Sequence, residues 1–231
     1  MSRSSIDILY EDNHLIIVNK QVGDIMQGDK TGDEPLSEKV AAFIAERDGK
    51  PGKAFVGVPH RLDRPVSGVS VFVKTSKGLE RMNELFRSGE IRKIYWAIVA
   101  CLPIHPEGEL LHYLVRNEQL NKSKAYTYRV EHSKEARLKY RVVASGDRYH
   151  LLEIELLTGR HHQIRAQLAA IGSPVKGDLK YGAPRSNRNG GISLHARSIR
   201  FIHPVRKTEI FVEAPPPDDV LWKALATDLH K

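Results

Sequence analysis

The segment LKYRVVASGDRYHLLEIELL, residues 138–157, is the part of the sequence that says most about the fold. Two apolar stretches, 138–144 and 149–157, are separated by the Ser-Gly-Asp sequence at 145–147, whose residues favour tight turns. Apolar stretches on both sides of such a turn are typical of a β-hairpin. Because a hairpin joins antiparallel strands directly, whereas parallel strands need a long crossover, the segment predicts an antiparallel strand pair.

Strand signals continue on both sides of this hairpin and outnumber helix signals. The expected strands are 6–10, 14–18, 69–74, 94–102, 199–202 and 209–212, and the expected helices are 36–47, 77–87, about 159–171 and 218–229. Residues 117–125 are expected to form an exposed loop, and Thr158 is expected to cap the helix that follows it. Hairpin signals outnumber strand–helix–strand signals, so we predict an α+β fold with a mixed, mostly antiparallel β-sheet core and flanking helices. Without repeats or a clear linker, the simplest organisation is one domain over residues 1–231.

The charge balance favours a polyanionic partner. The chain has 36 Lys and Arg against 28 Asp and Glu, a formal net charge of +8. A folded surface with this excess attracts nucleic acid, although charge says nothing about chemistry and a merely basic protein is the alternative. No apolar stretch approaches the ~20 residues that span a bilayer, and the first residues lack the apolar stretch of a signal peptide. We therefore expect a cytoplasmic protein with no membrane association, in which the single cysteine, Cys101, is buried within an apolar run.

Several common kinds of catalytic site are absent from the sequence. It has no phosphate-binding P-loop, no dinucleotide-binding glycine motif, no Gly-x-Ser-x-Gly elbow and no His-Glu-x-x-His pair. His161 and His162 are adjacent, so on a helix they would point about 100° apart and make a poor metal pair. We expect neither a metal nor a cofactor, and chemistry that comes from carboxylate, arginine and tyrosine side chains.

The segment HRLDRPVSG, residues 60–68, places Asp63 between Arg61 and Arg64 just ahead of an expected strand. Two neighbouring guanidinium groups favour the ionised form of a carboxylate, and arginines also suit contacts to phosphate. The proline and glycine of the segment would shape a loop that holds these groups at the edge of a cleft. The alternative is a surface salt bridge in a turn, which is the commoner outcome for such a composition.

The segment RKIYWAIV, residues 92–99, contains two aromatic residues on an expected strand. Strand alternation places Tyr95 on one face and Trp96 on the other. An aromatic ring exposed at a cleft would stack on a base, and the alternative is that either ring belongs to the core.

The segment TGRHHQIRAQL, residues 158–168, carries basic residues on an expected helix. His161 and Arg165 are four positions apart, at the border of the expected apolar stripe. An arginine at that border needs a carboxylate partner, and the alternative is that it extends into solvent.

Together these segments resemble the signature motifs of the RluA family of RNA pseudouridine synthases, in that family's order. The matching motifs are HRLD at 60–63 with Ser-Gly at 67–68, KIYWAIV at 93–99 and TGRHHQIR at 158–165. Further similarity lies in 8–12, 18–20, 172–182 and 194–204, so the resemblance covers about residues 6–215. The chain departs from the family pattern at Gln21, His161 and Gln167, which bears on the choice of substrate rather than on activity.

The resemblance implies a pseudouridine synthase fold with a central active-site cleft, here as a stand-alone catalytic domain without the N-terminal RNA-binding domain of many relatives. It implies isomerisation of specific uridines in rRNA or tRNA, without a cofactor and on a nucleotide flipped out of structured RNA. We expect a monomer whose partner is structured RNA. Which RNA and which uridine are not determined by the sequence.

The resemblance also implies roles for individual residues. Asp63 would be the catalytic carboxylate, as a nucleophile or in loss of a C2′ proton, with Tyr95 on the flipped uracil and Arg165 paired to Asp63. Arg61 would lie near the space that the nucleotide vacates. The other expected substrate-binding residues are Arg64, Arg160 and His161.

Two other functions share some of these features. A non-catalytic RNA-binding protein would share the charge and the loops, but it has no need of the Asp63 carboxylate. A carboxylate hydrolase usually needs a second acid, or clustered acids for Mg²⁺, and the first motif supplies one acid, with Asp147 and Asp178 as distant candidates. Tritium release from 5-³H-uridine RNA distinguishes a synthase from a binding protein, whereas free uracil or strand scission indicates a hydrolase.

Overall fold

The structure is a computed structural model that describes residues 6–28, 32–49 and 51–227. Contacts between Cα atoms divide the chain into two compact units. The first unit comprises the chain up to Ile91 together with Ala196–Pro215, and the second comprises Arg92–His195 together with the chain from Pro216.

The first unit is built on antiparallel strands. β1 (Ile8–Glu11) pairs with β2 (Leu15–Lys20), β2 pairs with β3 (Ser67–Val73), and β10 (Glu209–Glu213) pairs with β9 (Leu194–Ile202), all antiparallel. β3 lies beside β9, so these strands follow the order β1-β2-β3-β9, and β10 lies off this path and pairs with β9.

Helices pack on both faces of these strands, because residues of β2 alternate between two apolar clusters. Ile16 and Val18 pack with α1 (Leu36–Arg47) in one cluster. Leu15 and Ile17 pack with Met82 of α2 (Ser76–Ser88) in the other cluster. A strand covered on both faces reads as a continuous apolar run, which explains the Leu-Ile-Ile-Val sequence of β2.

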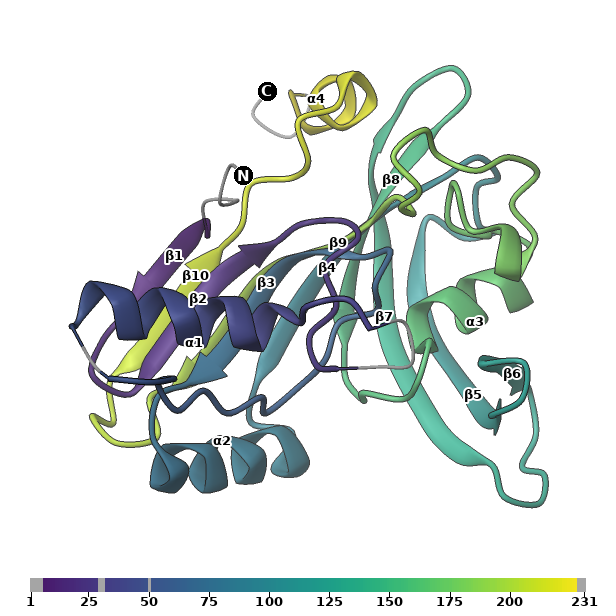
Figure 1. Ribbon diagram of the computed structural model, residues 1–231. Coiled ribbons are helices and arrows are strands. Elements are labelled where there is room, and N and C mark those ends of the chain that lie inside the picture. Colours follow the sequence, from purple (N-terminus) through teal and green to yellow (C-terminus); the bar gives the residue numbers. More distant parts are fainter. Residues whose placement is uncertain (1–5, 29–31, 50, 228–231) are drawn as a thin grey trace. The chain divides into compact units, whose positions relative to one another are not determined.

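The second unit is a row of antiparallel strands in the order β4-β8-β7-β5-β6. The strands are β4 (Arg92–Val99), β5 (Glu107–Asn117), β6 (Lys122–Tyr126), β7 (Lys134–Ser145) and β8 (His150–Leu156). β7 and β8 form the predicted hairpin, in which the Gly146 amide donates to the Tyr149 carbonyl (2.9 Å). α3 (Gln163–Ala170) packs against β5 and β6, α4 (Val220–Thr227) packs against β7 and β8, and a short 3₁₀ turn, η1 (Leu179–Tyr181), follows α3 (Figure 1).

The predicted fold class is confirmed: the chain is α+β with mostly antiparallel strands. The helices predicted at 36–47 and 77–87 lie within one residue of the bounds of α1 and α2. The helix predicted at 218–229 is observed as α4, and the end of that prediction lies outside the described residues. A single domain over residues 1–231 stays a prediction. Among the residues that the structure describes, no helix is long and apolar enough to cross a bilayer.

The loop predicted at 117–125 is correct only for residues 118–121, because Asn117 ends β5 and residues 122–125 belong to β6. β6 is polar because it lies at the end of the strand row, where it buries little. The preceding strand, β5, was not predicted either. Cys101, expected to be buried, is exposed, because β4 ends at Val99 and the cysteine lies in the bend that follows.

The helix predicted from about residue 159 begins instead at Gln163. His162 precedes it with a left-handed backbone conformation (φ 53°), which a helix cannot continue through. Thr158 does not cap the helix: its hydroxyl accepts from the Arg137 amide (2.9 Å) and donates to the Gln163 side chain (2.7 Å). His161 therefore precedes the helix, and it does not share a helix face with Arg165.

The backbone conformation of Gly68, at the start of β3, and its close approach to β9 predict that a larger residue there destabilises the fold. Its φ is +114°, and a Cβ atom there would lie 2.3 Å from the carbonyl oxygen of Ala196 on β9. Gly68→Ala is expected to lower the free energy of unfolding by about 2–5 kcal/mol, because it adds overpacking to backbone strain. The matched control is Gly89→Ala, where φ is +79° but nothing lies within 4 Å, so a loss of about 1 kcal/mol is expected. Equal losses in urea denaturation of the two variants would contradict this account.

Candidate active site

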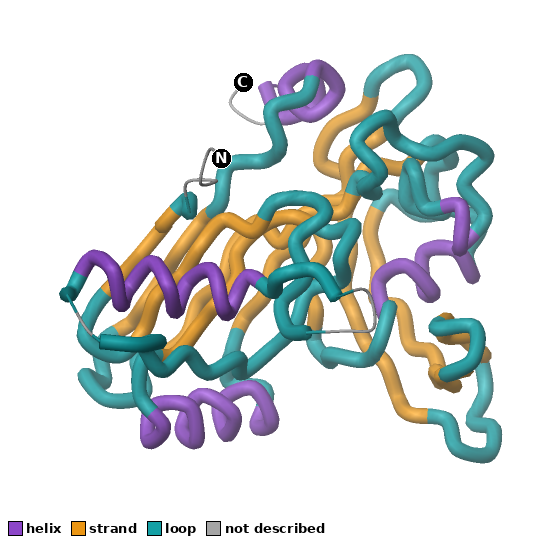
Figure 2. The backbone as a smooth tube through the Cα atoms, in the orientation of Figure 1, coloured by secondary structure: helices purple, strands orange, loops and turns teal. Residues whose placement is uncertain are grey.

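Loops such as the long connection between α1 and β3 are drawn in teal in Figure 2. By its place in the sequence, Asp63 lies near the end of that connection, just before β3. Its neighbours Leu62 and Val66 are buried, Arg61 and Arg64 are exposed, and Asp63 itself is half-buried. The Val66 amide donates to the Asp63 carbonyl (3.0 Å) and closes a tight turn. The two buried side chains fix the backbone, so the Asp63 carboxylate is held partly exposed beside two exposed arginines.

His60 anchors the start of this loop. Its Nε2 accepts a hydrogen bond from the Val71 amide of β3 (2.9 Å), and its ring stacks on Phe86 of α2 with centroids 4.8 Å apart. Because Nε2 accepts this hydrogen bond, it carries no hydrogen itself, so the N–H of the neutral imidazole is at Nδ1. The histidine of the HRLD motif thus joins the loop to a strand and a helix of the first unit.

Lys20, the last residue of β2, holds the same loop through hydrogen bonds to its backbone. Its side chain is 1% exposed, and Nζ donates to the carbonyl oxygens of Gln21 (3.1 Å), Arg64 (3.2 Å) and Val66 (2.6 Å). Burial lowers the pKa of this ammonium group from 10.5 to about 8, while the carboxylates of Asp24 and Asp63 act in the opposite direction. At neutral pH a buried cation therefore ties the turn after Asp63 to the end of β2.

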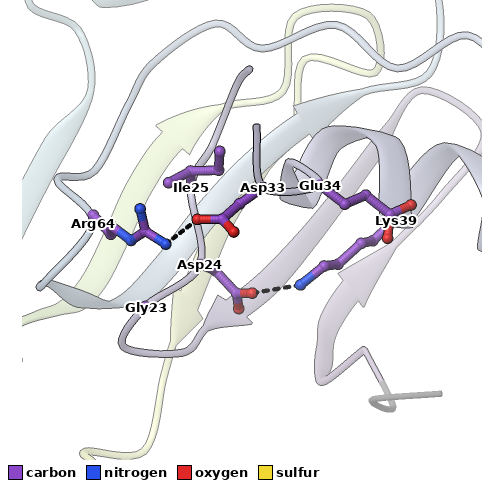
Figure 3. A pocket seen from close by; sticks show the side chains of 7 residues that line it. All are labelled: Gly23, Asp24, Ile25, Asp33, Glu34, Lys39 and Arg64. Carbon is purple, nitrogen blue, oxygen red and sulfur yellow. Dashed lines mark hydrogen bonds and ion pairs between the residues drawn. The ribbon is translucent and has the colours of Figure 1, made fainter. Parts of the chain in front are cut away.

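Arg64 points into a pocket of about 260 Å³ on the first unit (Figure 3). Its guanidinium pairs with Asp33, and across the pocket Lys39 pairs with Asp24 (2.8 Å). Both pairs are partly exposed, so each contributes little to stability. Glu34 adds a further carboxylate to the lining, so the pocket as it stands does not favour an anion. A phosphate that binds Arg64 must compete with Asp33.

Tyr95 lies in the middle of β4, opposite Ile154 of β8. Trp96 packs in the core cluster with Ile98 and Trp222, on the face of the strand away from Tyr95. The predicted alternation of β4 is confirmed, and for Trp96 the core alternative holds. Tyr95 is 9% exposed, so most of its ring is fixed by the surrounding protein.

Arg165 is buried in α3 and pairs with Asp178. Its Nε donates to one carboxylate oxygen (2.6 Å) and a terminal nitrogen to the other (2.9 Å), and the side chains are 6% and 1% exposed. The guanidinium carbon also lies 5.0 Å from the centroid of the Tyr181 ring. The alternative in which Arg165 extends into solvent is wrong. The predicted pairing with Asp63, a residue of the first unit, stays a prediction.

His161 joins the start of the α3 segment to β6. Its Nδ1 lies 2.9 Å from the Ser123 hydroxyl and its Nε2 lies 3.1 Å from the Asn121 side-chain oxygen. The Ser123 amide donates to the Tyr181 hydroxyl (2.8 Å), which also bonds to Nδ1 of His162 (3.0 Å). The segment before α3, the strand β6 and η1 are thereby held together by polar contacts.

The predicted site residues fall into two groups. Asp63, Arg61 and Arg64 share one loop of the first unit. The second unit holds Tyr95, Arg165, His161 and Arg160, and here His161 and Arg165 are linked through Ser123 and Tyr181. Arg160 is exposed, and its Nε donates to the Glu135 carbonyl of β7 (2.9 Å). Within the described residues, no group of three or more His, Cys, Asp and Glu side chains could hold a metal ion.

Reasoning from the sequence missed the supporting roles of Lys20, His60 and Asp178. Lys20 gave a usable signal, since a lysine that ends a strand with four consecutive apolar residues must find polar partners for its charge. Asp178 gave a weaker one: it follows the buried Val175 in a loop rich in glycine. Neither signal identifies the partner, which is distant in sequence.

Comparison with known proteins adds independent information. The model of the RNA pseudouridylate synthase family matches residues 14–170. The chain is 31% identical to the uncharacterized RNA pseudouridine synthase YhcT of Bacillus subtilis, over 93% of this chain and 70% of the relative. It is 30% identical to the ribosomal large subunit pseudouridine synthase D of Xylella fastidiosa (96% and 70%) and 29% identical to the tRNA pseudouridine synthase C of Vibrio vulnificus (95% and 94%).

A solved structure supports the fold. The human RNA pseudouridylate synthase domain containing 4 superposes with a TM-score of 0.78 and covers 97% of this chain and 93% of its own. At 23% identity, this likeness concerns the fold.

The lowered pKa of Lys20 predicts how the free energy of unfolding depends on pH. Because its folded-state pKa of about 8 lies below the unfolded value of 10.5, the unfolded chain binds more protons between these pH values. The cost of burying the charged form is therefore present below pH 8 and is relieved as pH rises through the window. Relative to Lys20→Met, the wild type should gain about 2–3 kcal/mol of unfolding free energy between pH 7.5 and 10.5. Urea denaturation at both pH values measures this difference, and parallel pH dependence of the two proteins would contradict it.

Proposed function

This chain belongs to the RNA pseudouridylate synthase family and is an RNA pseudouridine synthase, and from this premise we propose that it isomerises specific uridines of rRNA or tRNA through the Asp63 carboxylate. The target nucleotide is flipped out of structured RNA, since a uridine inside a stem is out of reach of the protein. The reaction is an isomerisation, and its substrate and product have the same atoms.

The reaction moves the glycosidic bond from N1 to C5 of one uracil. The N1–C1′ bond breaks, the uracil turns, the C5–C1′ bond forms, C5 loses its proton and N1 gains one. No oxidation state changes overall, so the proposal requires no redox cofactor. The Asp63 carboxylate either attacks C1′ or accepts the C2′ proton, and both routes require it to be ionised and to reach the ribose.

The catalytic role of Asp63 is supported most directly by the way its loop is held. The adjacent Leu62 and Val66 are buried, and Lys20 binds the carbonyls that follow Asp63, yet the carboxylate is only half-buried. A rigid backbone that presents a partly exposed carboxylate suits a group that must meet a substrate at a fixed position. A surface salt bridge in a turn needs no buried lysine beneath it.

The proposed roles of the other residues follow from their environments. Tyr95, held within β4, stacks on the extruded uracil and helps to remove the C5 proton. Arg165 pairs with Asp63 as well as with Asp178, which is chemically reasonable because a guanidinium carries five N–H donors. Arg61, exposed beside Asp63, occupies the space that the flipped nucleotide leaves.

We propose that the exposed Arg64 and Arg160 bind RNA phosphates, and that His161, which follows Arg160 in the chain, also contacts the RNA. Arg64 exchanges Asp33 for a phosphate, and this exchange costs little because the present ion pair is partly exposed. Binding through phosphates weakens as salt rises. We further propose that the protein acts as a monomer in the cytoplasm.

Asp63→Asn tests the catalytic role. The variant is expected to fold normally and to bind RNA within about threefold of the wild type, because the amide keeps the size of the carboxylate. Pseudouridine formation should fall by at least about 1000-fold, since an amide neither attacks C1′ nor accepts a proton. Tritium release from 5-³H-uridine RNA measures the activity, and substantial product from this variant would remove Asp63 from the catalytic role.

The matched control is Asp7→Asn, the same chemical change at an exposed position of the first unit, which should keep full activity. Products made by the wild type decide between the alternatives. Binding without tritium release would indicate an RNA-binding protein, and free uracil or strand scission would indicate a hydrolase.

Tyr95→Phe tests the second catalytic residue. The ring still stacks on the base, so RNA affinity should stay within about threefold, whereas loss of the hydroxyl should lower kcat by about 100-fold. Tyr140→Phe is the control, because it removes a buried hydroxyl from the same unit, where it donates to the His105 carbonyl. If affinity collapsed while turnover survived, Tyr95 would be a binding residue alone.

A further inference from the structure

We propose that Asp178 is a positioning residue for the isomerisation: its buried carboxylate sets the orientation of the Arg165 guanidinium. This inference rests on the proposed function, in which Arg165 serves the reacting carboxylate. Asp178 itself does not touch the substrate and acts through the arginine.

The contact between the two side chains fixes the plane of the guanidinium. Both oxygens of Asp178 are engaged, one by Nε (2.6 Å) and the other by Nη2 (2.9 Å) of Arg165. Such a bidentate pair leaves little rotation about the axis between the two groups. Because Asp178 occupies the Nε–Nη2 edge, a second carboxylate that binds this guanidinium approaches from the Nη1 side.

Tyr181 restrains the face of the guanidinium. Its ring centroid lies 5.0 Å from the guanidinium carbon, and the ring is itself held through its hydroxyl, which bonds to the Ser123 amide and to His162. An arginine that is stacked on a fixed ring and bound along one edge has a defined position. Asp178 and Tyr181 belong to the same turn, so one short segment supplies both restraints.

The backbone around Asp178 is fixed and joined to the strand that carries Tyr95. The Asp178 amide donates to the Val175 carbonyl (3.0 Å), and the Asp178 carbonyl accepts from Tyr181 and Ala183 (both 3.0 Å). Val175 forms an isolated β-bridge with Val99, the last residue of β4. Asp178, Arg165 and Tyr95 are thus parts of one compact unit, so the arginine is positioned relative to the proposed stacking ring.

Stability alone gives a poor reason for this ion pair. Burying two charges carries a desolvation cost, and an apolar pair of similar volume is often as stable or more stable. The described geometry gives the pair a different use, since an apolar pair could not present a guanidinium edge in a fixed direction. A buried aspartate that accepts two hydrogen bonds from a proposed catalytic arginine therefore serves to orient that guanidinium.

Asp178→Asn is the main test, because it keeps the volume of the side chain and removes its charge. With the full-length protein and a transcribed RNA substrate, kcat is expected to fall about 100-fold, with KM and RNA affinity within about threefold of the wild type. Leu225→Ala is the control, a core substitution in α4 of the same unit, in a different apolar cluster from the residues of α3. It lowers stability, but its kcat at 20–30 °C below its melting temperature should stay close to that of the wild type.

A double-mutant cycle separates positioning from general support. If Asp178 acts through Arg165, adding Asp178→Asn to Arg165→Lys should lower kcat by less than threefold further. Two independent losses that multiply, or an Asp178→Asn variant with normal kcat, would overturn the proposal.

If the Asp178→Asn variant fails to fold, Asp178→Glu replaces it: the longer carboxylate keeps the charge and should retain more than a tenth of wild-type kcat. A wild type that makes no pseudouridine would refute the proposed function, whereas an active wild type with an equally active Asp178→Asn variant would refute this inference alone.

Discussion

The ammonium group of Lys20 lies at the end of β2 with almost no exposure and donates to carbonyl oxygens of the turn after Asp63. The shape of the Asp63 loop depends on these bonds, above all on the buried one to the Val66 carbonyl, because the Arg64 carbonyl also accepts from the Gly23 amide. Burial lowers the pKa of the lysine, and the negative charge of Asp63 acts to keep its proton. The lysine that supports the loop and the carboxylate that the loop presents are therefore coupled electrostatically.

Each unit of the protein contains a buried cation, and the two are held in different ways. Lys20 is surrounded by backbone carbonyls, which suit a compact ammonium that donates in several directions. Arg165 faces the carboxylate of Asp178, which matches the planar fork of a guanidinium. The first arrangement shapes a backbone turn, and the second sets the direction of a side chain. In both, a charge is buried where geometry matters more than a gain in stability.

The motif HRLDRPVSG divides into residues that hold the loop and residues that face solvent. His60 binds β3 and stacks on α2, and Gly68 permits an approach of β3 to β9 that no other residue could make. Arg61 is exposed and Asp63 is half-buried. The motif thus combines an anchor at each end with reactive groups between them, which accounts for its length as well as its composition.

Local pattern in the sequence determined much of this protein: the β7–β8 hairpin, the helix α1, the alternation of Tyr95 and Trp96, and the motif that contains Asp63. Such features depend on residues that are close in the chain, where periodicity and turn residues report directly on conformation. The tertiary structure alone decided the partner of Arg165 and the support of the Asp63 loop by Lys20. It also decided the start of α3, because the Thr158 hydroxyl binds β7 and the Gln163 side chain instead of capping a helix. Periodicity says which side of an element is buried, but a charged group finds its partner across sequence distances that no local pattern spans.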